Sequence, residues 1–201
     1  MAITDYASLQ ASIASWLHRD DLTAVIPDFI AIAEDHLSAD LEAREMEIRY
    51  PITIPVSGQY ITLPNDVLEI RRVMIFGDPN QILTYATPDE IAVEYPSSLT
   101  MKPLRFSVIG NEMQFAPISD AAYTGEIVYR QALVPLSTTN AANWLLTKYP
   151  NAYLYASLLA AQFFVEDQDK FQLIQSAYQA AINNINSVDW YTGSTMAVRA
   201  H

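Results

Sequence analysis

The chain has 201 residues, of which 51% are hydrophobic and 17% charged, and it contains no cysteine. This length suits one domain, or one core with a smaller subdomain, and the lack of cysteine excludes disulfides, thiolate catalysis and sulfur-ligated metals. The formal net charge of −12, with no basic cluster longer than Arg71-Arg72, argues against a protein that grips nucleic acid by its phosphates.

Two helices are predicted at the N-terminal end. Thr4 can cap the first, over residues 4–18, and Pro27 fits the first turn of the second, over residues 27–44. Opposite faces of the second helix are apolar and acidic. Its apolar stripe is Ile26, Ile30, Ala33, Leu37 and Leu41, and its acids are Asp28, Glu34, Asp35, Asp40 and Glu42.

The hydrophobic period then changes from that of a helix to two, which predicts a β insertion over about residues 47–131. Pro51 and Pro55 place its first strand at a sheet edge or a bulge, because proline cannot donate to the ladder. Arg71 and Arg72, adjacent in one strand, are expected to point to opposite faces. The further strands are predicted at 60–63, 67–76, 104–109, 113–116 and 125–131, with a short helix that begins at Thr87.

The last third of the chain is predicted to be helical, with helices over residues 149–166 and 168–186. Residues 149–165 carry no charge, but the stretch is slightly short for a membrane span of about 20 residues and contains Pro150 and Asn151, so it is predicted to be a buried helix. The final helix again has two faces. Its apolar stripe is Phe171, Ile174, Tyr178, Ala181 and Ile185, and its amide face is Gln172, Gln175, Gln179, Asn183 and Asn186.

The amide face is a candidate interface between subunits. Between Arg130 and Asp189 the charged residues are Lys148, Glu166, Asp167, Asp169 and Lys170. Solvated helices usually carry many charges on their outer face, whereas the cores of interfaces are depleted of charge. Gln172, Gln175, Gln179 and Asn183 are therefore the candidate inter-subunit face. The alternative is that the sheet of the same chain covers these helices.

Residues 187–201 show no clear period and are expected to form a flexible C-terminal arm. Large apolar groups on such a segment usually need somewhere to dock. The candidate binding residues of the arm are Trp190, Tyr191, Met196, Val198 and Arg199. The alternative is an arm that folds back on its own domain.

Taken together, these elements predict an α+β fold. The N- and C-terminal helices form a helical bundle, the insertion forms a small, mostly antiparallel central β-sheet, and the C-terminal arm is extended. Residues 1–186 are assigned to a single domain and residues 187–201 to the arm.

No catalytic or metal-binding pattern is found. No two of the three histidines share the i, i+4 spacing of a helical metal pair, and Asp167-Gln168-Asp169 lacks the glycine and distal glutamate of a calcium loop. We therefore expect no enzyme activity, no metal and no cofactor. The alternative is a metal-dependent hydrolase that uses Glu34-Asp35-His36, disfavoured because neighbouring carboxylates on a helix point to different sides.

Three segments carry a resemblance that covers nearly the whole chain. They are Ile3-Thr4-Asp5-Tyr6 with the acidic helix to Glu45; Tyr60 through Val73; and Tyr129 through Leu136, followed by Thr139-Asn140, Asn143-Trp144-Leu145-Leu146, Tyr149-Pro150 and Tyr153-Leu154-Tyr155-Ala156. In these segments the chain resembles the head–tail adaptor (connector) proteins of tailed bacteriophages.

The resemblance implies a structural virion protein at the head–tail interface, made in the cytoplasm of the host bacterium. It implies a homo-oligomeric ring, commonly a dodecamer, that docks under the portal protein, surrounds the DNA exit channel used in genome ejection, and holds a downstream tail or nozzle protein. The arm with Trp190 and Tyr191 would grip the portal, and no membrane is involved. DNA would pass without specific binding, because an acidic, lysine-poor protein repels phosphate. Another neck or tail-completion protein is the alternative.

Overall fold

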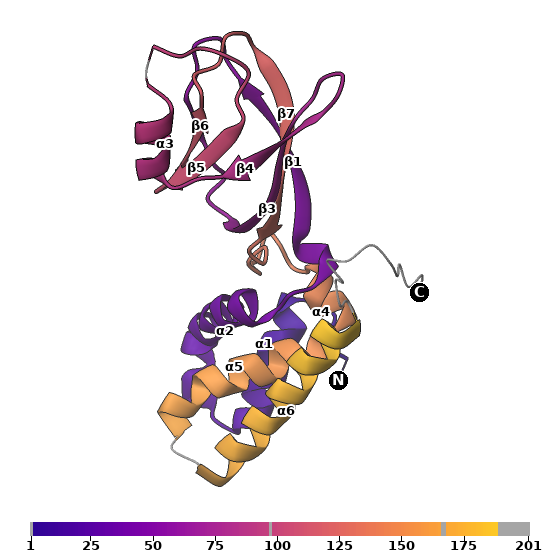
Figure 1. Ribbon diagram of the computed structural model, residues 1–201. Coiled ribbons are helices and arrows are strands. Elements are labelled where there is room, and N and C mark those ends of the chain that lie inside the picture. The colour runs from indigo at the N-terminus through magenta and orange to yellow at the C-terminus, as the bar shows by residue number, and fades with distance from the viewer. Residues whose placement is uncertain (1, 97, 166–167, 189–201) are drawn as a thin grey trace. The chain divides into compact units, whose positions relative to one another are not determined.

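The computed structural model describes residues 2–96, 98–165 and 168–188 (Figure 1). In this part of the chain the fold is α+β, with six α-helices and a seven-stranded, mostly antiparallel sheet, which confirms the predicted class. The chain divides into two compact units, a helical unit from residues 1–46 and 133–201 and a β unit from residues 47–132. The assignment of residues 1–186 to one domain stays a prediction. The first two residues of the predicted arm, 187 and 188, belong to the last helix, and residues 189–201 lie outside the described residues.

The described helical unit is arranged around one central helix. Helix α5 packs against α1, α2, α4 and α6 (Figure 1). It is the charge-free stretch that the sequence predicts to be a buried helix, and most of its described side chains lie in the core. The elements are α1 (Tyr6–Leu17), α2 (Ile26–Asp40), α4 (Trp144–Lys148), α5 (Pro150–Val165) and α6 (Gln168–Val188), with 3-10 turns at Asp20–Val25 and Arg44–Met46. Nowhere in the described chain does a helix combine the length and apolarity that crossing a membrane requires.

The boundaries of the first two helices differ from the prediction. Asp5, rather than Thr4, caps α1: its carboxylate accepts from the Ser8 backbone N–H at 2.7 Å, and the Ser8 hydroxyl oxygen accepts from the Asp5 N–H at 2.9 Å. Helix α2 ends at Asp40, before the predicted residue 44, because Leu41 takes up an extended backbone and its side chain is buried. The predicted apolar stripe of α2 is confirmed, since all five of its residues are buried.

The β unit is one sheet with the strand order β1-β7-β3-β4-β5-β6-β2. Strand β1 lies at an edge, as Pro51 predicts, and pairs only with β7, the strand that precedes the return to the helices. Strand β4 and helix α4 are elements that the sequence analysis missed. The bounds are β1 Glu47–Ile54, β2 Tyr60–Thr62, β3 Val67–Ile75, β4 Gln81–Tyr85, α3 Pro88–Glu94, β5 Arg105–Ile109, β6 Glu112–Ala116 and β7 Tyr123–Gln131.

One face of this sheet is apolar and buried. Gly125 lets β7 lie close to β3, since a Cβ there would come within 2.2 Å of the Met74 carbonyl oxygen. At the end of β7, Asp66 accepts from the Tyr129 hydroxyl at 3.0 Å and from the Gln131 side-chain amide at 2.5 Å. Burial, followed by the hydrogen bond to Asp66, raises the pKa of Tyr129 to about 12, so this tyrosine stays a hydrogen-bond donor at neutral pH.

Glu34 is buried in the helical unit, which corrects its assignment to the acidic face of α2. Its carboxylate accepts from the Leu136 backbone N–H at 2.7 Å and from the Tyr153 hydroxyl at 3.0 Å. One turn away, the Ser38 hydroxyl accepts from the Leu133 N–H at 3.1 Å. These bonds hold the segment through which the chain re-enters the helical unit. Burial raises the pKa of Glu34 against the opposing effect of the two hydrogen bonds.

Replacing Glu34 with alanine removes the acceptor of two buried donors, so we expect the free energy of unfolding to fall by about 1–3 kcal/mol. Glu34→Gln keeps an acceptor oxygen and should cost less. Because the pKa is raised in the folded state, the wild type should lose stability, relative to Glu34→Gln, as the pH rises from the ordinary carboxyl range through the raised pKa.

Urea unfolding between about pH 4 and pH 8, a range that brackets ordinary and raised carboxyl pKa values, measures both effects. Glu112→Gln, at an exposed position in β6, is the control and should show neither. Equal stability of the wild type and Glu34→Ala would contradict the role of Glu34 as a buried acceptor.

Candidate interaction surfaces

The candidate inter-subunit residues lie together on the outer face of α6. Gln172, Gln175, Gln179 and Asn183 are all exposed, whereas Ile174, Tyr178, Ile182 and Ile185 on the opposite face are buried in the helical unit. Leu173 is exposed beside the amides. From Phe171 to Ser187 the helix contains no charged residue. The result is an uncharged, partly apolar helix surface that is exposed among the described residues.

Burial within the chain accounts for only part of the shortage of charge. The core position of α5 explains why that helix has none. The elements that pack against α5 include α6 and other helices of the same unit. The alternative that the sheet covers these helices stays a prediction. Asn186 departs from the predicted face, since its side-chain oxygen accepts from the Glu42 N–H at 2.9 Å and its amide donates to the Asp40 carbonyl at 2.9 Å. The four remaining amides are the candidate face.

The candidate arm residues, Trp190, Tyr191, Met196, Val198 and Arg199, lie outside the described residues. Their proposed role in binding a partner, and the alternative of an arm that folds back, both stay predictions.

The residues of the hydrolase alternative do not converge on one site. Glu34 points into the core, where it holds Leu136 and Tyr153, whereas Asp35 and His36 are exposed. Across residues 2–96, 98–165 and 168–188, no group of three or more histidine and acidic side chains could hold a metal ion.

The β unit carries an open groove of about 430 Å³ with a mostly apolar lining. Leu68, Tyr85 and Phe106 contribute to it, and Asn111 donates to Asn65 at 3.0 Å among the residues that line it. No carboxylate, histidine, lysine, serine or threonine is among the lining residues. The groove therefore offers surface for packing, and Tyr85 is the one lining side chain of a type that also serves as a general acid, base or nucleophile.

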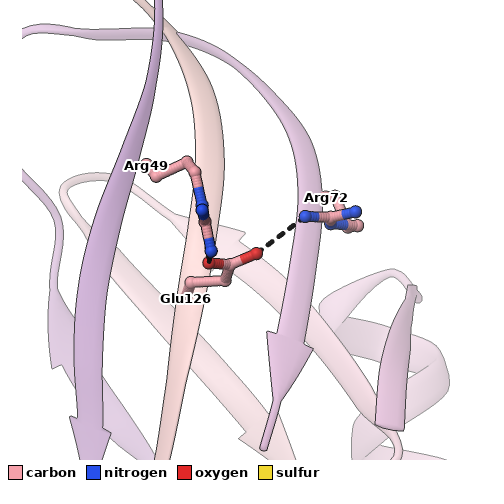
Figure 2. Close-up of polar contacts among 3 residues, drawn as sticks. All are labelled: Arg49, Arg72 and Glu126. Carbon is pink, nitrogen blue, oxygen red and sulfur yellow. Dashed lines mark hydrogen bonds and ion pairs between the residues drawn. The ribbon is translucent and has the colours of Figure 1, made fainter. Parts of the chain in front are cut away.

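An arginine pair that the sequence analysis missed lies on the solvent face of the sheet (Figure 2). Arg49 of β1 donates from Nε to Glu126 of β7 at 2.8 Å and also donates from Nη2, while Arg72 of β3 donates to the other carboxylate oxygen at 2.7 Å. The Glu126 side chain is only 5% exposed, whereas those of Arg49 and Arg72 are 72% and 43% exposed. One buried carboxylate thus holds two guanidinium groups that face solvent.

Further ion pairs extend this charged face across β1, β7 and β3. Arg71 lies 3.0 Å from Glu69 and 3.6 Å from Glu47, and Arg130 lies 3.9 Å from Glu69. Glu47 and Glu69 are both cross-strand partners of Arg130, so they share its face of the sheet. The expectation that Arg71 and Arg72 point to opposite faces is wrong, because a β-bulge between Ile70 and Arg72 brings both guanidinium groups to this face.

Two arginines next to one carboxylate set its ionisation. The hydrogen bonds from Arg49, followed by those from Arg72, hold the pKa of Glu126 below its ordinary value although burial opposes this. Glu126 therefore stays charged at neutral pH, and the three side chains form a fixed group with one net positive charge.

We expect Glu126→Gln to lower the stability of the chain at neutral pH, because two neighbouring guanidinium groups lose their shared counter-charge. A depressed pKa contributes stability above the ordinary carboxyl pKa, and this contribution is lost as the pH falls through the lower folded-state pKa. The difference in melting temperature between wild type and Glu126→Gln should therefore shrink on acidification. Glu112→Gln, at an exposed position in β6, is the matched control, and an acid-independent difference would contradict this account.

Comparison with known proteins supplies the family. A family model described as SU10 adaptor protein matches residues 4–199, nearly the whole chain. A search of curated proteins gives no match. The matched range includes both units and the segments around Asp66, Leu136 and Tyr153, whose polar contacts hold the described structure together. The chain belongs to the SU10 adaptor protein family, a family of phage head–tail adaptors and structural components of the virion.

Proposed function

We propose that the chain assembles into a ring, of about twelve copies if it follows the commonest arrangement of such adaptors, under the portal protein of a tailed phage. The ring surrounds the DNA exit channel, connects the capsid to a downstream tail or nozzle protein, and acts by association alone. The observation that carries this proposal is the match to the adaptor family over residues 4–199.

The outer face of α6 supports contact between neighbouring copies. Gln172, Gln175, Gln179 and Asn183 are exposed on a helix face without charge, and the cores of protein interfaces are depleted of charge in the same way. Amides can bond across such an interface without the cost of desolvating an ion. We assign this face to the contact between neighbouring subunits.

The net charge supports the passage of DNA. With 23 acidic against 11 basic side chains, the chain carries a net negative charge that repels phosphate. A basic ring would retain DNA through the release of counterions. A ring of this composition lets the genome slide past and binds no specific sequence.

The arm is assigned to the portal. Trp190 and Tyr191 are the residue types that dominate binding energy at interfaces. If assembly needs the contact between this arm and the portal, the free protein stays monomeric or weakly associated, and the portal acts as the template for the ring.

The first experiment is mass determination by light scattering, for the chain alone and after mixing with the portal of its own phage. We expect a monomer or weak oligomer to become a portal complex with about one adaptor per portal subunit, as a closed ring requires. Gln175→Glu with Gln179→Glu should lower that ratio, because the contact between subunits would then have to bury two unpaired charges.

A stable ring formed by the chain alone would contradict the role of the portal as template. If the chain and the portal do not associate, the portal-binding proposal fails, and another neck or tail-completion role takes its place.

Deletion of residues 187–201 should abolish portal binding and leave the fold intact. The core described for the helical unit ends at Ile185, so we expect the circular dichroism and melting temperature to stay close to those of the full chain. Trp190→Ala with Tyr191→Ala tests the arm within the full-length chain. Unchanged affinity of both variants for the portal would refute the assignment.

A further inference from the structure

The arginine pair on the β unit has N–H donors for which the described chain supplies no acceptor. Arg49 and Arg72 donate to Glu126, and within the described chain no other hydrogen bond or ion pair of either side chain is found. A guanidinium group has five N–H donors, so several on each arginine remain available. Because Glu126 holds both groups in place, little further ordering is needed when a partner carboxylate binds.

We propose that this face binds helix α2 of a neighbouring copy, with Asp28 and Asp35 of that copy pairing with Arg49 and Arg72. The proposal rests on the proposed ring and names a contact within it. Identical copies in a ring meet through two different surfaces, which must be complementary to one another. The arginine pair and the exposed side of α2 are complementary in charge, in spacing and in their apolar content.

The spacing of the backbone positions that carry the charges is similar on the two surfaces. Arg49 and Arg72 are both cross-strand partners of Val128, on either side of β7, so their backbones lie two strand spacings apart, about 10 Å. Asp28 and Asp35 are seven residues apart on α2, a rise of about 10.5 Å along the helix axis. The two guanidinium groups converge on Glu126 and so lie closer together than their backbones. A helix that lies across the strands, parallel to the row Arg49–Val128–Arg72, would therefore place its two carboxylates on the outer sides of the two guanidinium groups.

The apolar side chains between the charges match as well. On α2, Ile32 lies between Asp28 and Asp35 on the same side of the helix and is 44% exposed. On the sheet, Val128 lies between the two arginines, and Met74 and the exposed Ile82 follow on the same face. Ile32 would pack over Val128, and the two ion pairs would flank this contact.

The surroundings of the arginine pair favour a protein carboxylate over DNA phosphate. The face carries Arg49, Arg71, Arg72 and Arg130 together with Glu47, Glu69 and Glu126, a net charge of only +1. Three glutamates would repel the densely charged backbone of DNA. A helix with two isolated carboxylates matches the local positive charge without that repulsion. In the described chain, no hydrogen bond or ion pair engages the Asp28 or Asp35 side chain.

Disulfide cross-linking tests the contact directly, because the chain has no cysteine of its own. Ile32→Cys and Val128→Cys are prepared separately, mixed, and oxidised both free in solution and bound to the portal. We expect a disulfide-linked dimer that contains one copy of each variant. Ile32→Cys mixed with Val93→Cys, an exposed position on α3 of the β unit, is the matched control and should yield little cross-linked dimer.

Charge reversal identifies the pairs. Arg49→Glu leaves Arg72 to hold Glu126 and should lower the cross-linking yield by roughly fivefold, the scale of an exposed ion pair. Either Asp28→Arg or Asp35→Arg in the neighbouring copy should restore the yield, and only one of them, because the helix can lie in one direction only. The melting temperature of each variant shows that it remains folded.

The outcomes separate this contact from the adaptor role. If about one adaptor binds per portal subunit but Ile32 and Val128 do not cross-link, the contact is wrong and the adaptor role stands. Cross-linking without portal binding supports the contact and refutes the portal role. No cross-link in either preparation overturns the contact. Affinity for a duplex DNA oligomer that is lost in Arg49→Glu, without a cross-link, would assign the arginines to phosphate and also overturn it.

Discussion

The helical unit depends on the hydrogen bonds between α2 and the segment that follows the β insertion. The insertion lies between residue 46 and residue 133, so the two parts of the helical unit are far apart in the sequence and must still pack together. Glu34 and Ser38 accept from Leu136 and Leu133, and Glu34 also accepts from Tyr153, whose oxygen in turn accepts from Asn143 at 2.6 Å. A buried carboxylate is costly unless its hydrogen bonds are satisfied. This network therefore specifies the position of the returning segment beyond what apolar packing alone achieves.

The distribution of charge over the helices agrees with this packing. Helix α5 lies in the core and can carry no charge, whereas α6 covers it with one apolar face and leaves its amides outside. Glu34 is the exception on α2, since its neighbours Asp35 and Asp28 stay exposed. In the β unit, the solvent-facing side of the sheet carries charged residues. The buried carboxylate of Glu126 on that side is neutralised by two arginines. Among the described residues, the two buried acids, Glu34 and Glu126, thus both have partners.

Hydrophobic periodicity predicted the fold class, the long helices and most strands. An element that buries one face carries apolar residues at a regular spacing, and this spacing can be recognised in the sequence. It missed α4, which has only five residues, and β4, which is also short. It placed Glu34 on the wrong face, although Glu34 lies four residues after Ile30 and three before Leu37, at the border of the apolar stripe. The arginine pair depends on β1 pairing with β7 and on a bulge in β3. Both are long-range features that no local pattern encodes.

The two proposed contact surfaces differ in charge, as we expect for a ring that assembles only on the portal. The α6 face is uncharged and can pack only when copies are already held side by side, whereas the arginine pair and the carboxylates of α2 attract over several ångströms and are weakened by salt. Weak, charge-steered contact between copies favours correct orientation without stable rings in solution. On that basis the portal would supply the local concentration that turns these contacts into a closed ring. The low charge of the helix face and the fixed guanidinium pair of the sheet then serve successive steps of one assembly.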